Sequence, residues 1–92
     1  MDTGAGTVLK LKNMLASQGQ MAEVGTVMAG PGGRVAFRGA QRVAADFGGD
    51  AADWVKKTSS SFADGKGTKF ENHWVENIRT GQRVEFKTKF PE

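Results

Sequence analysis

The stretch Lys69 to Phe90, KFENHWVENIRTGQRVEFKTKF, decides the fold class, because its apolar and polar side chains alternate with a period of two. Two such runs are separated by Arg79-Thr80-Gly81, and the glycine can adopt the left-handed conformation that closes a three-residue hairpin loop. The pattern therefore predicts a β-hairpin over residues 69–90, with Ile78 opposite Gln82.

The same alternation predicts the register of the hairpin. A three-residue loop places Trp74 opposite Phe86, and Phe70 opposite Phe90, on one apolar face. A two-residue loop would set Trp74 against a charged residue, so the hydrophobic pattern favours the odd loop. The expected pairs on the polar face are Glu71–Lys89, His73–Lys87, Val75–Glu85 and Asn77–Arg83.

Residues 54–62 are expected to add a third strand. Trp54 and Phe62 would share the apolar face, and Asp64-Gly65-Lys66-Gly67 would connect this strand to the hairpin. A helix over Ala51 to Lys57 is the competing interpretation. With the strand, the polar face carries Val55, Lys57, Ser59 and Ser61.

Helical spacing dominates the first half of the chain. One helix is predicted around Val8, Leu11 and Leu15, a second around Met21, Val24 and Met28, and a third from Ala36 to a stop at Gly48-Gly49. The predicted fold class is α+β, with N-terminal helices packed on one face of a small antiparallel β-meander of three or more strands. Residues 1–92 form one domain, with a helical lead-in over 1–33 and a core over 34–92.

Composition narrows the function classes. The 92 residues include no cysteine and one histidine, which excludes disulfide scaffolds and cysteine-based zinc sites. No apolar run approaches the ~18–20 residues of a membrane span, so no membrane partner is expected. The net charge of +3 lies entirely in residues 54–92, and such a basic surface favours nucleic acid as the partner.

The polar face of the predicted sheet gathers the parts needed for cleaving RNA without a metal or another cofactor. A base removes the 2′-hydroxyl proton, an acid protonates the leaving 5′-oxygen, and cations stabilise the charge on the phosphate. His73 is the best candidate for proton transfer because its ordinary pKa lies near neutrality. The predicted catalytic residues are His73, Glu71, Glu85 and Lys87, and the predicted RNA-binding residues are Lys57, Arg83, Lys89 and Ser59.

Three other interpretations remain open from the residues. Glu85-Phe86-Lys87 matches the Glu-x-Lys element of metal-dependent nucleases, with Glu71 or Glu76 as a further magnesium ligand. The domain could instead bind nucleic acid without cleaving it, or bind only protein. Ordinary cross-strand ion pairs on a solvated face would give the same polar pattern.

The stretches WVKKTSSSF (54–62) and KFENHWVENIRTGQRVEFKTKF (69–90) resemble the C-terminal toxin domains of bacterial polymorphic toxins of the Rhs and contact-dependent inhibition types. The resemblance implies a ribonuclease of the barnase-EndoU-colicin-RelE group, acting on RNA, with tRNA as the expected target. It also implies an acidic cognate immunity protein, a monomeric domain, and delivery as part of a larger secreted or cell-surface protein to a target-cell cytoplasm. Many members of that group use more than one histidine, whereas this chain has only His73.

Overall fold

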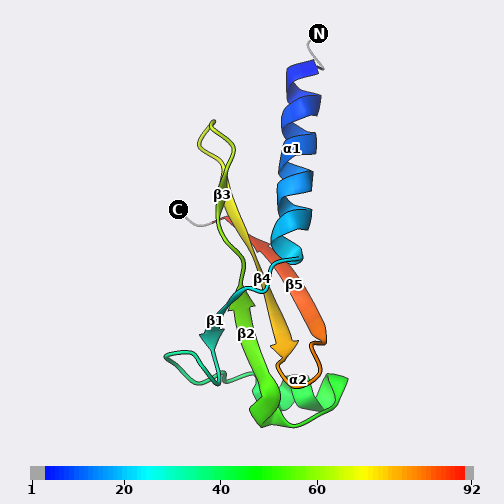
Figure 1. Ribbon diagram of the computed structural model, residues 1–92, viewed down its shortest axis with the longest axis vertical. Helices are drawn as coiled ribbons and strands as arrows, with labels where there is room; N and C mark the ends of the chain where they lie inside the picture. Colours follow the sequence, from blue (N-terminus) through cyan, green and yellow to red (C-terminus); the bar gives the residue numbers. More distant parts are fainter. Residues whose placement is uncertain (1–3, 91–92) are drawn as a thin grey trace.

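The computed structural model describes residues 4–90, with side chains from residue 10 onward, and consists of two α-helices and a five-stranded antiparallel sheet (Figure 1). The predicted α+β class, with helices preceding most of the sheet, is confirmed. In chain order the elements are α1 (Gly4–Met21), β1 (Thr26–Ala29), α2 (Ala40–Phe47), a 3-10 turn (Ala51–Asp53), β2 (Trp54–Thr58), β3 (Phe62–Ala63), β4 (Lys69–Asn77) and β5 (Arg83–Lys89).

Strand β4 organises the sheet because it pairs with three other strands. Its second half pairs with β2, its first residues pair with β3, and β5 lies along its other edge. Strand β1 extends the sheet beyond β2, and β1, β3 and β5 each pair with only one other strand. The predicted strand over 54–62 is interrupted between Thr58 and Phe62, and the competing helix is limited to the 3-10 turn before Trp54.

The N-terminal segment differs from its prediction in one element. Helix α1 runs through Gly19 to Met21, and the second predicted helix is instead β1, which pairs with β2. A glycine costs a helix only about 1 kcal/mol, so Gly19 does not end α1. The free hydrogen-bonding edge of β2 stabilises residues 26–29 as a strand, and this edge exists only after the sheet has formed.

The remaining helix predictions are confirmed in part. Helix α2 ends where expected, at Gly48, whose φ of +94° suits a glycine, although the helix begins at Ala40 rather than Ala36. Val8 lies within α1, but its side chain is outside the described ones. The expected helical lead-in over 1–33 contains the strand β1, which joins the sheet, as well as the helix α1.

The hairpin between β4 and β5 has a longer loop than predicted. The amide of Asn77 donates to the carbonyl of Gln82 at 2.8 Å, so residues 78–81 form a four-residue loop and Ile78 does not pair with Gln82. This loop shifts the first pairs by one residue, to Val75 with Val84 and Glu76 with Arg83. The predicted pairs Val75–Glu85 and Asn77–Arg83 are therefore wrong.

A β-bulge at Glu85 and Phe86 restores the predicted register further along the hairpin. Glu85 has a φ of +56°, and the two residues together lie opposite Trp74. Beyond the bulge the predicted pairs of Glu71 with Lys89 and His73 with Lys87 are confirmed. The rings of Trp74 and Phe86 stack at 5.6 Å, as the hydrophobic pattern predicts.

The sheet has two packed faces, because alternate residues of β4 contact different helices. One face, the α1 side, carries Phe70, Asn72, Trp74 and Glu76, and the end of α1 contacts it through the buried Gln20–Asn72 hydrogen bond. The opposite face, the α2 side, carries Glu71, His73 and Val75, and its core cluster is Val43, Trp54 and Val75. Trp54 therefore lies on the opposite face from Trp74, contrary to the prediction that they share one.

Helix α1 projects past the end of the sheet and gives the molecule its elongated shape of 53 × 23 × 19 Å (Figure 1). Leu11, Met14 and Leu15 on this helix are more than half exposed. Within residues 4–90, no helix has the length and apolar character needed to cross a membrane.

Candidate active site

A small pocket of about 160 Å³ opens on the α2 side, between the sheet and α2. It brings together four of the predicted site residues, His73, Glu85, Lys87 and Lys89, and it is more basic than acidic. The lining residues are Phe37, Arg42, Lys56, His73, Trp74, Val75, Glu85, Lys87 and Lys89.

His73 lies in the middle of β4 with its side chain only 14% exposed. Both ring nitrogens are buried and have no hydrogen-bond partner among the described residues. Buried polar atoms normally have partners, so an imidazole with two unsatisfied nitrogens is an exception that marks this site, although neither nitrogen is exposed at the pocket surface. The prediction that His73 occupies a fully open face is wrong, because α2 and Phe37 narrow the access to it.

Glu71 is the carboxylate next to the imidazole. Its Oε2 lies 3.4 Å from His73 Nε2, which is an electrostatic contact longer than an ordinary hydrogen bond. Thr58 Oγ1 donates to the same oxygen at 2.6 Å, and this hydrogen bond holds the pKa of Glu71 below its ordinary value, with His73 and Lys69 adding to the effect. Glu71 is therefore ionised at neutral pH and fixed beside His73.

Glu85 lines the same pocket but has a different partner. Arg42 of α2 grips its carboxylate with two hydrogen bonds of 2.8 and 2.9 Å, and this contact lowers the pKa of Glu85. The residue with the left-handed backbone conformation at the β-bulge, Glu85, is therefore also the one whose side chain contacts α2. An ionised carboxylate held by a guanidinium is poorly placed to transfer protons, so the geometry favours Glu71 over Glu85 as the partner of His73.

Three lysines place positive charge around His73. Lys87 lies directly across the ladder from His73, and Lys89 lies across from Glu71, as the sequence predicted. Lys56 of β2 also lines the pocket, and the sequence analysis missed it together with Thr58 and Arg42. The alternation of side chains along β2 could have identified Lys56 and Thr58, but the prediction placed these two residues on the face opposite His73.

Three predicted RNA-binding residues lie away from this pocket. Lys57 and Arg83 contact Glu76 on the α1 side, each at 2.9 Å, and Arg83 also covers the ring of Trp74. Ser59 is buried, and its hydroxyl accepts a hydrogen bond from the amide of Asn72. The prediction that these three residues share the face of His73 is therefore wrong. The alternate residues of β2 face the opposite sides from those predicted, which moves Lys57 and Ser59, and the four-residue hairpin loop moves Arg83.

The Glu-x-Lys element at Glu85-Phe86-Lys87 does not gather a metal-binding cluster. Within residues 4–90, no group of three or more histidine, aspartate or glutamate side chains is close enough to hold a metal ion. Glu85 is paired with Arg42, Glu71 contacts His73, and Glu76 lies on the opposite face of the sheet. The donor set required by the metal-dependent interpretation is therefore dispersed.

Comparisons with known proteins add no relative to this description. No family model matches the chain, and neither a curated protein nor a solved structure matches it significantly. The geometry of the His73 pocket is therefore the basis for assigning a function.

Proposed function

We propose that this chain is a toxin domain that cleaves RNA, with tRNA as the expected substrate, by metal-independent acid–base transphosphorylation. One observation carries the proposal: a buried imidazole, whose ring nitrogens have no hydrogen-bond partner among the described residues, lines a basic pocket and contacts an ionised carboxylate. A histidine oriented by a carboxylate is a recurrent proton-transfer unit, and lysines around it suit a phosphodiester.

The residues of the pocket divide the chemistry as follows. His73 takes the proton of the 2′-hydroxyl while the 2′-oxygen forms its bond to phosphorus, and Glu71 stabilises the resulting imidazolium. Lys87, across the ladder from His73, gives a proton to the 5′-oxygen as its bond to phosphorus breaks. The products are a 2′,3′-cyclic phosphate and a free 5′-hydroxyl, and Lys56 and Lys89 hold the phosphate during the displacement.

The toxin interpretation includes a partner. A domain with this activity would endanger the cell that makes it, so we propose an acidic immunity protein that covers the His73 pocket. Its negative charge would complement Lys56, Lys87 and Lys89, which speeds association and excludes RNA. Delivery within a larger secreted or cell-surface protein, and action in a target-cell cytoplasm as a monomer, belong to the same proposal.

The experiment compares the parent protein with His73→Ala on total RNA and on purified tRNA, with and without EDTA. We expect cleavage in EDTA, cyclic phosphate ends, and a loss of roughly 10²–10⁴ in the cleavage rate of His73→Ala. Lys66→Ala, in the exposed loop between β3 and β4, is the matched surface control and should keep the parental rate.

The measurement needs two checks on the variant protein. Thermal melting must show that His73→Ala is folded, and RNA binding must persist, so that lost cleavage reports lost chemistry. A folded His73→Ala that cleaves within a few-fold of the parent would refute the mechanism. Cleavage that stops in EDTA and returns with magnesium would favour the metal-dependent alternative, and binding without cleavage would favour a nucleic-acid-binding domain.

A further inference from the structure

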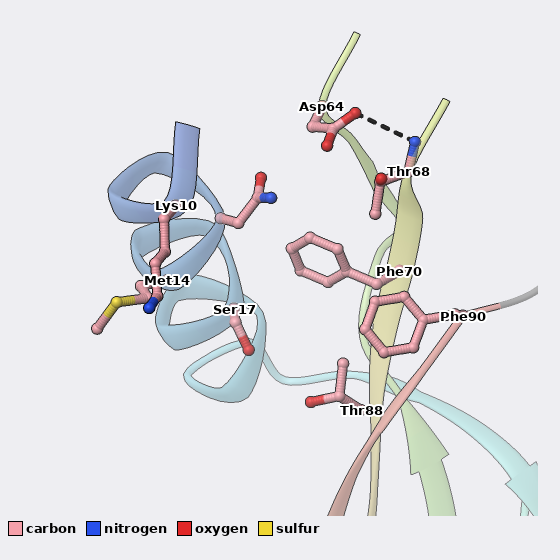
Figure 2. Close-up of a pocket in the computed structure, with 9 residues that line it drawn as sticks. Lys10, Met14, Ser17, Asp64, Thr68, Phe70, Thr88 and Phe90 are labelled. Carbon is pink, nitrogen blue, oxygen red and sulfur yellow. Dashed lines mark hydrogen bonds between the residues drawn. The ribbon is translucent and has the colours of Figure 1, made fainter. Parts of the chain in front are cut away.

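A second and larger concavity lies on the α1 side, where α1 leans over the end of the sheet (Figure 2). This α1 groove has a volume of about 480 Å³, which is within the usual range for small-molecule sites of ~300–1,000 Å³. Its lining includes Asn13, Met14 and Ser17 from α1, Phe70 from β4, Thr88 from β5, and Phe90 directly after β5. None of them lines the His73 pocket, which is on the other face.

The floor of the α1 groove is aromatic. The rings of Phe70 and Phe90 lie 6.0 Å apart at 58°, and Phe62 continues the row at 5.4 Å from Phe70. Phe70 is buried, whereas Phe90 is 64% exposed and closes one wall of the groove. An exposed flat ring beside a buried one offers a surface on which a planar ring can stack.

The walls of the α1 groove carry unused hydrogen-bonding capacity. Asn13 Oδ1 is buried without a partner among the described residues. Ser17 Oγ accepts a hydrogen bond from Asn72 at 2.9 Å, so its own proton is available to a ligand. An aliphatic occupant would leave both groups unsatisfied, whereas a heteroaromatic ring with polar edges would pair with them while stacking on Phe90.

Strand β5 connects this groove with the His73 pocket. It is an outer strand, and beyond the bulge its side chains alternate across the edge of the sheet. Lys87 and Lys89 line the His73 pocket, while Thr88 and Phe90 line the α1 groove. A nucleic acid strand that crosses the β5 edge can therefore place a phosphate at the lysines and an adjacent base at Phe90.

We propose that the α1 groove is a nucleobase-binding site for the RNA whose phosphate is held at Lys87 and Lys89. This inference rests on the proposed function for the identity of the ligand, and it assigns the recognition of a base outside the cleavage pocket to α1. The groove supplies stacking from Phe90 and polar contacts from Asn13 and Ser17, so it contributes affinity and base preference.

The test uses the full chain with His73→Ala, so that the probe stays intact. The probe is a 5′-fluorescent RNA hexanucleotide, titrated by anisotropy against this protein and against the same protein carrying Phe90→Leu. Leucine keeps the apolar volume but removes the flat ring, so we expect an affinity loss of about 5–100-fold from the lost base stacking. Phe47→Leu makes the same chemical change on α2, away from the groove, and should bind as the parent does.

Two further measurements connect the loss to a base in the groove. In a series of hexanucleotides that each lack one base, the probe that lacks the base at the groove should bind the His73→Ala protein more weakly than the others. With that probe, adding Phe90→Leu should cause no further loss of affinity. Amide resonances of Asn13, Ser17 and Thr88 should shift on RNA addition in the parent. Thermal melting checks that the Phe90→Leu protein is folded. We expect it to be, because Phe90 is 64% exposed and its replacement disturbs little of the core.

The outcomes separate this inference from the proposed function. If the parent cleaves RNA but Phe90→Leu binds the hexanucleotide equally well, the groove inference is wrong and the proposed function stands. If cleavage is absent but binding depends on Phe90 and on one base, the groove inference stands and the proposed function fails. If Phe90→Leu lowers the affinity for the immunity protein but not for the hexanucleotide, the groove is a protein-binding surface and the inference is overturned.

Discussion

Glu76 on the α1 side should be the most stability-critical charge of the molecule. Its carboxylate accepts hydrogen bonds from Lys57 Nζ at 2.9 Å and from Trp74 Nε1 at 3.1 Å, and it forms an ion pair with Arg83 Nε at 2.9 Å. The side chains of Lys57 and Glu76 are only 10% and 11% exposed. We predict that Glu76→Leu strongly destabilises the domain, because it leaves Lys57 as a buried cation without its counter-charge.

The magnitude follows from the burial of the pair. Removing one partner of a buried ion pair costs about 3–5 kcal/mol, since the remaining charge cannot regain water. A domain of 92 residues has roughly 5–14 kcal/mol of stability in total, at about 0.05–0.15 kcal/mol per residue. The double variant Lys57→Met with Glu76→Leu removes both charges, and replacing both partners by apolar side chains is often close to neutral. It should therefore recover most of the loss.

The assay is urea unfolding followed by tryptophan fluorescence, since Trp54 and Trp74 are both buried. The parent, the two single variants and the double variant form a double-mutant cycle. Glu23→Ala, an exposed carboxylate that contacts Ser60, is the control and should cost little. The reasoning is refuted if Glu76→Leu costs less than about 1 kcal/mol, or if the double variant is as unstable as the sum of the single ones.

Two further predictions concern acid and the partner. The pKa of Glu76 is lowered, because the hydrogen bonds and charges of Lys57, Trp74 and Arg83 outweigh the opposing effect of burial, and the pKa of Glu71 is lowered chiefly by its hydrogen bond from Thr58. A carboxyl group whose pKa is lowered in the folded state stabilises the fold above its ordinary pKa of 4.5. This contribution is lost as the pH falls through the folded-state pKa, so Tm should fall with acidification below pH 4.5. Thr58→Val should raise the pKa of Glu71 in a carboxyl NMR titration, and an unchanged value would contradict the assigned cause. An acidic immunity protein over the His73 pocket should bind Lys56→Glu and Lys87→Glu more weakly in calorimetry but Lys66→Glu normally, and equal binding of all three would place it elsewhere.

The hairpin and several of the other elements could be predicted from the sequence, because they depend on local periodicity. Alternation over residues 69–90 identified β4 and β5, and the stacking of Trp74 on Phe86 followed from it. Helix α2 and its end at Gly48 followed from helical spacing and a glycine stop. The pairs of His73 with Lys87 and Glu71 with Lys89 were also correct, although the predicted loop length was wrong.

Only the tertiary structure decided which side chains share a face. A one-residue change in a loop or a bulge reverses every side chain beyond it, and nothing local to Lys56 or Lys57 indicates which of them faces His73. Residues 26–29 became a strand because β2 offers them a hydrogen-bonding edge, and Arg42 reached the pocket because α2 packs across the sheet. The sequence thus determined most of the elements, whereas long-range packing determined β1, the contacts of Lys57 and Arg83 with Glu76, and the place of Lys56 and Thr58 in the site.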